Sequence, residues 1–253
     1  MDLLQGFADI SLFQILLVAA VALFASVVGG VTGYGSSALM PLVLVPIVGA
    51  EPVVPILSLS ALFTNSSRVA AFWPLIDRRR ALIVLVAAVP TCALGAWGYT
   101  MLTGKGAAIV IGGMLVASVP LRRLMRRRGL ALSTRGLAAA SFGWGPLAGG
   151  TVGAGIILLS LLMAAGLEGA AVVATDAVVS IGIGLTKFAT FGLAGAIDAK
   201  VIAIALLIGC VAFPGAFVAK ALTTRLPVHV HTAILDAMVL GGGAVMIVNA
   251  FAH

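Results

Sequence analysis

Polar side chains gather in two apolar stretches of this 253-residue sequence. The polar residues of the first stretch are Ser58, Ser60, Thr64, Asn65, Ser66, Ser67 and Arg68, and those of the second are Thr175, Asp176, Ser180, Thr186 and Lys187. Asn65 and Arg68 are three residues apart, so they share a face if the stretch is helical. Together they would offer amide and guanidinium donors to an oxyanion. The alternative is that the serines and threonines bond to the backbone of their own helix.

Three of these polar residues carry a charge. Asp176 lies near the middle of its apolar run, where an ionised carboxylate is costly, so we expect it to exchange a proton and to act as a proton-coupling group. Arg68 and Lys187 lie near the ends of their runs and are candidates to bind an anionic substrate, although long cationic side chains can also reach for the membrane surface. We rank Arg68 first, because a guanidinium can donate hydrogen bonds to two oxygens at once. The position of Lys187 near the end of its run favours an ammonium group at the membrane surface.

Two glycine-rich breaks interrupt the apolar runs, GGVTGYG at residues 29–35 and GGTVGAG at residues 149–155. Glycine lets the chain leave the helix, and the N–H groups at the start of the next helix attract anions. Irregular backbone at membrane depth is tolerated only around protein or a water-filled cavity. The breaks and the second polar stretch therefore supply these further substrate-binding candidates: Thr32, Gly33, Tyr34, Gly35, Ser36, Ser37, Thr151, Gly153, Gly155 and Thr175. The alternative is that the glycines serve close helix packing.

The amino-acid composition and the lengths of the apolar runs indicate that these residues lie on transmembrane helices. The chain is 62% hydrophobic and 9% charged, whereas soluble domains are about a quarter charged. A transmembrane helix needs roughly 20 apolar residues. Full-length candidates lie near residues 11–31, 52–72, 80–102, 106–121, 135–150, 168–188, 200–222 and 231–251. Two runs, 36–48 and 154–165, are too short to span comfortably, so we predict an all-α integral membrane protein with eight to ten transmembrane helices.

The breaks indicate an internal repeat. The glycines of the first break recur 120 residues later, from Gly29 to Gly149. A short run, an acidic turn ending at Glu51 or Glu168, and a long helix with a late cation follow each break. We therefore predict two pseudo-symmetric transmembrane repeats, residues 1–121 and 135–253, joined by an arginine-rich cytoplasmic linker, residues 122–134. Repeats of this kind are typical of secondary transporters.

The orientation of the repeats depends on the short runs. If these runs span, each half has five helices and the repeats are inverted. If they re-enter, each half has four helices and the repeats are parallel. The N-terminus contains Asp2 and Asp9 and has no cation before the first run, which favours an outside location and the inverted arrangement.

Charge and motifs narrow the function. The net charge of +7 comes from arginines between the apolar runs, which is a topological pattern that also suits anionic lipid, and we expect no nucleic-acid partner. Cys92 and Cys210 lie in different halves, so we expect no disulfide. A metal site at His229, His231 and Asp236 is disfavoured, because further ligands would have to come from elsewhere. The sequence has no phosphate-binding loop for ATP and no HExxH or GxSxG motif, and we expect no enzyme.

Four features together resemble the sulfite exporter TauE/SafE family: the GGVTGYGSS stretch, the short run after it, the polar helix containing TNSSR, and the second copy GGTVGAG. The resemblance covers almost the whole chain. It implies a multi-pass carrier of the bacterial inner membrane that moves sulfite, sulfonates or related small anions, usually as an exporter, without a cofactor. The second copy has Ala154 in the place of Tyr34 and lacks the serine pair, so the halves would contribute unequally.

We therefore expect a secondary transporter, working as an exporter, for a small sulfur-containing or carboxylate anion. Its expected partners are that anion, membrane lipid and protons as the coupling ion, and the sequence leaves homo-oligomerisation open. A passive anion channel, and a membrane-embedded enzyme or assembly subunit without transport activity, are the alternatives.

Overall fold

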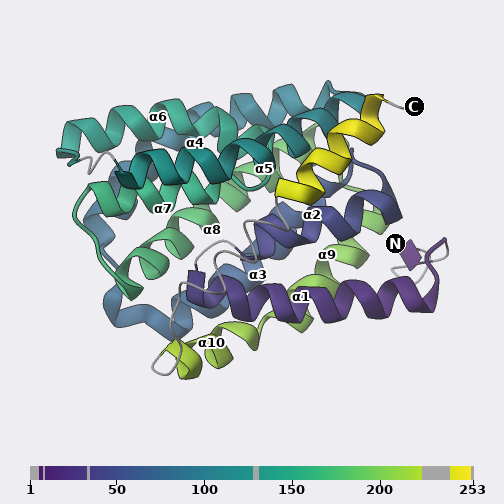
Figure 1. Cartoon of the computed structure of the whole chain (residues 1–253), viewed down its shortest axis with the longest axis horizontal. Helices are drawn as coiled ribbons and strands as arrows, with labels where there is room; N and C mark the ends of the chain where they lie inside the picture. Colours follow the sequence, from purple (N-terminus) through teal and green to yellow (C-terminus); the bar gives the residue numbers. More distant parts are fainter. Residues whose placement is uncertain (1–5, 8, 33–34, 128–130, 224–239, 252–253) are drawn as a thin grey trace.

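The computed structural model describes residues 6–7, 9–32, 35–127, 131–223 and 240–251, and no strand occurs among them. Their helices (Figure 1) are α1 Leu12–Thr32, α2 Gly35–Val48, α3 Val53–Phe72, the short 3-10 helix η2 Trp73–Leu75, α4 Arg78–Thr100, α5 Gly104–Arg127, α6 Thr134–Gly150, α7 Gly155–Ala164, α8 Ala170–Leu193, α9 Ala199–Ala212, α10 Gly215–Thr223 and a last helix Leu240–Phe251. The all-helical prediction is confirmed.

Five segments of the described chain are long and apolar enough to cross a membrane: Leu12–Gly30, Arg78–Thr100, Gly104–Leu121, Ala170–Leu193 and Ala199–Ala221. Hydropathy predicts eight full-length candidates. Three of these eight are not among the five segments. Helix α3 is 20 residues long but contains the polar residues of the first stretch, and α6 has only 17 residues. Only residues 240–251 of the last run are described. The number of spanning helices therefore remains a prediction.

The candidate span Ala199–Ala221 corresponds to the run predicted at residues 200–222 and contains a break. It divides into α9 and α10 at Phe213 and Pro214. Proline has no N–H to donate and its ring clashes with the preceding turn, which accounts for the interruption.

Both predicted short runs form helices of their own. Helix α2 has 14 residues and α7 has 10, and at 1.5 Å per residue α7 is only about 15 Å long. Each ends at a glycine with a left-handed backbone, Gly49 with φ 83° and Gly166 with φ 89°, as is common after a helix C-terminus. Residues 156–162 of α7 are all buried. Helix α7 is therefore enclosed by protein, which suits an element too short to span.

Helices α3 and α8 lie in the interior, between α4 and α6 on one side and α1 and α10 on the other (Figure 1). They pack against each other, and α8 also packs on α4 while α3 packs on α9. Of the 20 residues of α3, 13 are buried. The two polar stretches of the sequence are therefore brought face to face inside the protein.

Small residues let α4 and α6 approach closely. A Cβ at Gly145 would overlap the hydroxyl of Thr91, and a Cβ at Gly149 would overlap the carbonyl oxygen of Cys92. The hydroxyl of Thr91 also donates to the carbonyl of Phe142 across this interface, at 3.0 Å. In the second glycine-rich break, Gly149 therefore serves close helix packing, which is the alternative to a role in binding.

This interface predicts opposite effects for two alanine substitutions in α6. Gly149→Ala forces α4 and α6 apart and should lower stability by about 1 to 3 kcal/mol. At Gly143 a Cβ would meet nothing within 4 Å, so Gly143→Ala should leave stability unchanged or raise it by about 0.5 to 1 kcal/mol through helix propensity. Thermal unfolding of the two purified variants in detergent checks this. Equal melting temperatures would contradict the close approach.

Candidate functional site

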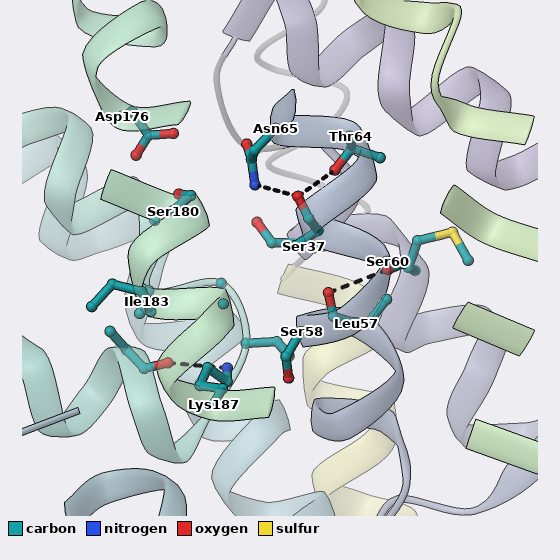
Figure 2. A pocket seen from close by; sticks show the side chains of 18 of the residues that line it. Ser37, Leu57, Ser58, Ser60, Thr64, Asn65, Asp176, Ser180, Ile183 and Lys187 are labelled. Carbon is teal, nitrogen blue, oxygen red and sulfur yellow. Dashed lines mark hydrogen bonds between the residues drawn. The ribbon is translucent and has the colours of Figure 1, made fainter. Parts of the chain in front are cut away.

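A cavity of about 140 Å³ lies between α3 and α8 (Figure 2). Its lining residues come from α2, α3, α6, the α6–α7 connection, the start of α7, α8 and α9. They are Ser37, Met40, Leu57, Ser58, Ser60, Ala61, Thr64, Asn65, Arg68, Trp144, Ala148, Thr151, Val152, Gly153, Ala154, Gly155, Asp176, Ser180, Ile183, Gly184, Lys187 and Ile208. The polar lining residues of α8 are Asp176, Ser180 and Lys187. They are four and seven residues apart, which places them on one face of the helix. Apolar walls with a few polar groups are typical of small-molecule sites.

Arg68 is buried in this cavity and is held by a neighbour on its own helix. It is 5% exposed, and its Nη1 donates to Asn65 Oδ1 at 3.3 Å. The Asn65 amide in turn donates to the carbonyl of Ala61 at 2.9 Å. The two side chains share a face, as their spacing predicts, but Asn65 also binds the guanidinium. Asn65 therefore orients Arg68 in addition to offering a donor of its own.

Asp176 lines the same cavity from α8. It is 2% exposed, and its Oδ1 is buried without a hydrogen-bond partner among the described residues. The carboxyl group and the Arg68 guanidinium are close enough to interact electrostatically. A buried carboxylate with an unsatisfied oxygen is costly in its ionised form, and protonation removes the charge. The site therefore contains a group suited to exchange a proton.

Lys187 points inward, and the expectation that it reaches for the membrane surface is wrong. It is 6% exposed, and its Nζ donates to the carbonyls of Ala148 and Thr151, both at 3.1 Å. The last carbonyls of a helix have no partner within it and carry partial negative charge. The end of α6 thus supplies hydrogen-bond acceptors for Lys187 inside the protein. The sequence of α8 alone contains no information on these acceptors.

The connection from α6 to α7 turns sharply at the cavity. Gly153 has φ 85°, a conformation that L side chains rarely adopt. The indole N–H of Trp144 donates to the carbonyl of Ala154 at 2.8 Å. Gly153, Ala154 and Gly155 line the cavity, so the start of α7 lies at its wall, where the N–H groups of Ile156 and Ile157 donate to the carbonyls of Gly153 and Ala154. Trp144 is a contributor that sequence reasoning missed, although an indole beside a glycine-rich break was a usable signal.

Most hydroxyl groups on α3 bond to their own helix, as the alternative reading proposed. Ser60, Thr64 and Ser67 donate to the carbonyls of residues three positions earlier, and Ser58 donates to the carbonyl of Val54. Ser66 is exposed. Ser58, Ser60 and Thr64 still line the cavity, and their hydroxyl oxygens retain acceptor capacity.

The remaining candidates have different positions. Thr175 does not line the cavity, because its hydroxyl accepts a bond from the backbone N–H of Asp77 at 3.0 Å. Gly35 begins α2. Gly33, Tyr34 and the side chains of Thr32 and Ser36 lie outside the described residues, as do His229, His231 and Asp236. In the part of the chain that the structure describes, no group of three His, Cys, Asp or Glu side chains could hold a metal ion.

Comparison with known proteins gives one match. The family model of the sulfite exporter TauE/SafE family matches residues 18–246, nearly the whole chain. No curated protein and no solved structure matches the chain. The resemblance drawn from the glycine-rich breaks is thus confirmed, and with it the reading of the chain as a multi-pass membrane protein that carries small anions. The chain belongs to the sulfite exporter TauE/SafE family of membrane transporters.

Proposed function

We propose that this protein is a secondary transporter that exports a small anion across the bacterial inner membrane. The substrate is sulfite, an organosulfonate, or a related sulfur-containing or carboxylate anion. The observation that carries the proposal is the charge of the buried cavity. Among the described residues, its charged lining residues are two cations, Arg68 and Lys187, and one carboxylate, Asp176, all with buried side chains, which sum to one positive charge. An anion of small size neutralises that charge.

Arg68 is the group best suited to recognise the anion. A planar guanidinium donates two parallel hydrogen bonds to two oxygens of a sulfonate, sulfite or carboxylate group. Asn65 restrains it from the side, so less rotamer freedom is lost on binding. The N-terminal end of α7, which carries the partial positive charge of the helix dipole, borders the same cavity at Gly155.

Asp176 links the anion to a proton in this proposal. The ionised carboxylate competes with the substrate for Arg68, since both are anions that interact with the same guanidinium. A proton on Asp176 removes the competition, so anion and proton bind together. The anion and the proton then cross together, so export requires an outward anion gradient that exceeds the inward proton gradient across the bacterial inner membrane.

The two-repeat architecture remains part of the proposal. Helices α3 and α8 meet at the cavity, and each follows a short helix that begins after a glycine-rich break. We assign residues 1–121 and 135–253 to two pseudo-symmetric halves, because secondary transporters place substrates where such repeats meet. A passive channel and a membrane-embedded enzyme or assembly subunit are the alternatives that the experiments below distinguish.

The first prediction concerns transport itself. In a thermal-shift panel of small anions on the purified protein, sulfite or a small sulfonate should raise the melting temperature, because a ligand that binds only the folded state stabilises it. Proteoliposomes should then show saturable flux of the same anion. Flux equal to that of empty vesicles would favour an enzyme or assembly subunit, and flux that never saturates would favour a channel.

The second prediction concerns Arg68. Arg68→Lys keeps the charge and removes the two-pronged donor, so anion affinity should fall roughly ten-fold to a hundred-fold, the equivalent of about 1.5 to 3 kcal/mol for a charged hydrogen bond. Asn65→Ala should reduce affinity less, because the guanidinium is retained. Arg79→Lys is the matched control, since Arg79 is exposed and does not line the cavity. Titration calorimetry measures all three, and wild-type affinity in both cavity variants would remove this pair from the site.

The third prediction concerns Asp176. With a small sulfonate as probe, which stays ionised throughout, wild-type affinity should rise as pH falls, because protonated Asp176 no longer competes for Arg68. Asp176→Asn should bind equally well at every pH, and its flux should not respond to a proton gradient. Glu168→Gln, at an exposed position, is the control. Proton-sensitive flux that persists in Asp176→Asn would point to a different coupling group.

A further inference from the structure

Lys187 is the second buried cation of the cavity, and its bonding differs from that of Arg68. We propose that Lys187 is a positioning residue that fixes the α6–α7 connection and neutralises its carbonyl groups. This inference rests on the proposed function as far as the anion is concerned. It assigns to Lys187 a task other than direct contact with the transported anion.

The hydrogen bonds of Lys187 carry the inference. Its ammonium has three donors, and two of them bind the carbonyls of Ala148 and Thr151. Ala148 lies in the last turn of α6, and Thr151 directly follows that helix. The lysine therefore connects α8 to the end of α6. In Figure 2 its side chain and that of Asp176 lie at opposite ends of the row of labelled α8 residues.

The connection is held from a second side by Trp144. This indole donates to the carbonyl of Ala154, so residues 151–154 are fixed between α6 and α8. Gly153, with its left-handed backbone, lies between the two anchoring points. The carbonyls of Gly153 and Ala154 also accept from backbone N–H groups of α7. The carbonyls at the end of α6 therefore gain most from a side-chain donor, because an unpaired carbonyl at membrane depth costs free energy.

The electrostatic consequence concerns the anion. The carbonyl end of α6 is partially negative, and the N–H end of α7 is partially positive. Both border the same cavity, because Ala148, Thr151 and Gly155 all line it. The Lys187 ammonium offsets the carbonyl end, so the positive end of α7 dominates the field at this wall. Without the lysine, the carbonyl oxygens would repel an anion.

Hydrogen–deuterium exchange of the full-length protein in detergent, without any ligand, tests the anchoring. Lys187→Met keeps most of the side-chain volume and removes the charge and the donors. Exchange of residues 151–156 should become about ten-fold faster, the size expected for loss of one charged hydrogen bond. Methanesulfonate affinity should weaken about ten-fold as well. Lys187→Arg, which keeps charge and donors, should retain most of both, and Lys200→Met, outside the cavity, should change neither.

The outcomes separate the alternatives. Unchanged exchange in Lys187→Met overturns the proposal, and a loss of affinity alone would make Lys187 a direct ligand. Faster exchange with wild-type affinity also overturns it, because the anchoring would then serve stability alone. Absence of anion binding by the wild type would defeat the proposed function, while the exchange measurement still reports on the anchor. If Lys187→Met does not fold, Trp144→Phe removes the other anchor and should change exchange and affinity in the same directions.

Discussion

A backbone that leaves the helical conformation inside a membrane must find partners for its N–H and C=O groups within the protein. In this chain that constraint is met at the connection between α6 and α7. The ammonium of Lys187 binds two carbonyls at the end of α6, and the indole of Trp144 binds a third at the start of α7. Helix α7 can then be short, because it is enclosed by other helices. The cavity exists where these irregular residues face α3.

The charged residues of the cavity are the basis of its proposed preference for anions. Two buried cations and one carboxylate line a space large enough for one small ligand. The two cations differ in their surroundings, since Arg68 is restrained by a side chain of its own helix and Lys187 by the backbone of another. In the proposed mechanism Arg68 recognises the anion, Asp176 carries the proton and Lys187 keeps the wall in place.

Much of this arrangement could be predicted from the sequence. Hydropathy indicated a helical membrane protein, the glycine-rich breaks indicated the short helices α2 and α7, and the family resemblance rested on the same residues. The spacing of Asn65 and Arg68 indicated a shared face, which their hydrogen bond shows. These features are local, because each depends on residues within a few turns of the same segment.

The features that could not be predicted depend on distant partners. The inward direction of Lys187 depends on carbonyls 36 and 39 positions away in the chain. Thr175 bonds to Asp77, 98 positions away, and so does not line the cavity. Gly149 packs against α4 although its motif also suits a binding site. Spacing within one stretch contains no information on these contacts.

The most direct test of the account is the position of a bound anion. Selenite is a heavier analogue of sulfite, and its selenium can be located by anomalous scattering in crystals of the full-length protein. The account predicts one anomalous peak inside the cavity between α3 and α8, within hydrogen-bond distance of the Arg68 guanidinium. A peak only at the protein surface, or an anion bound in the cavity without contact to Arg68, would contradict it.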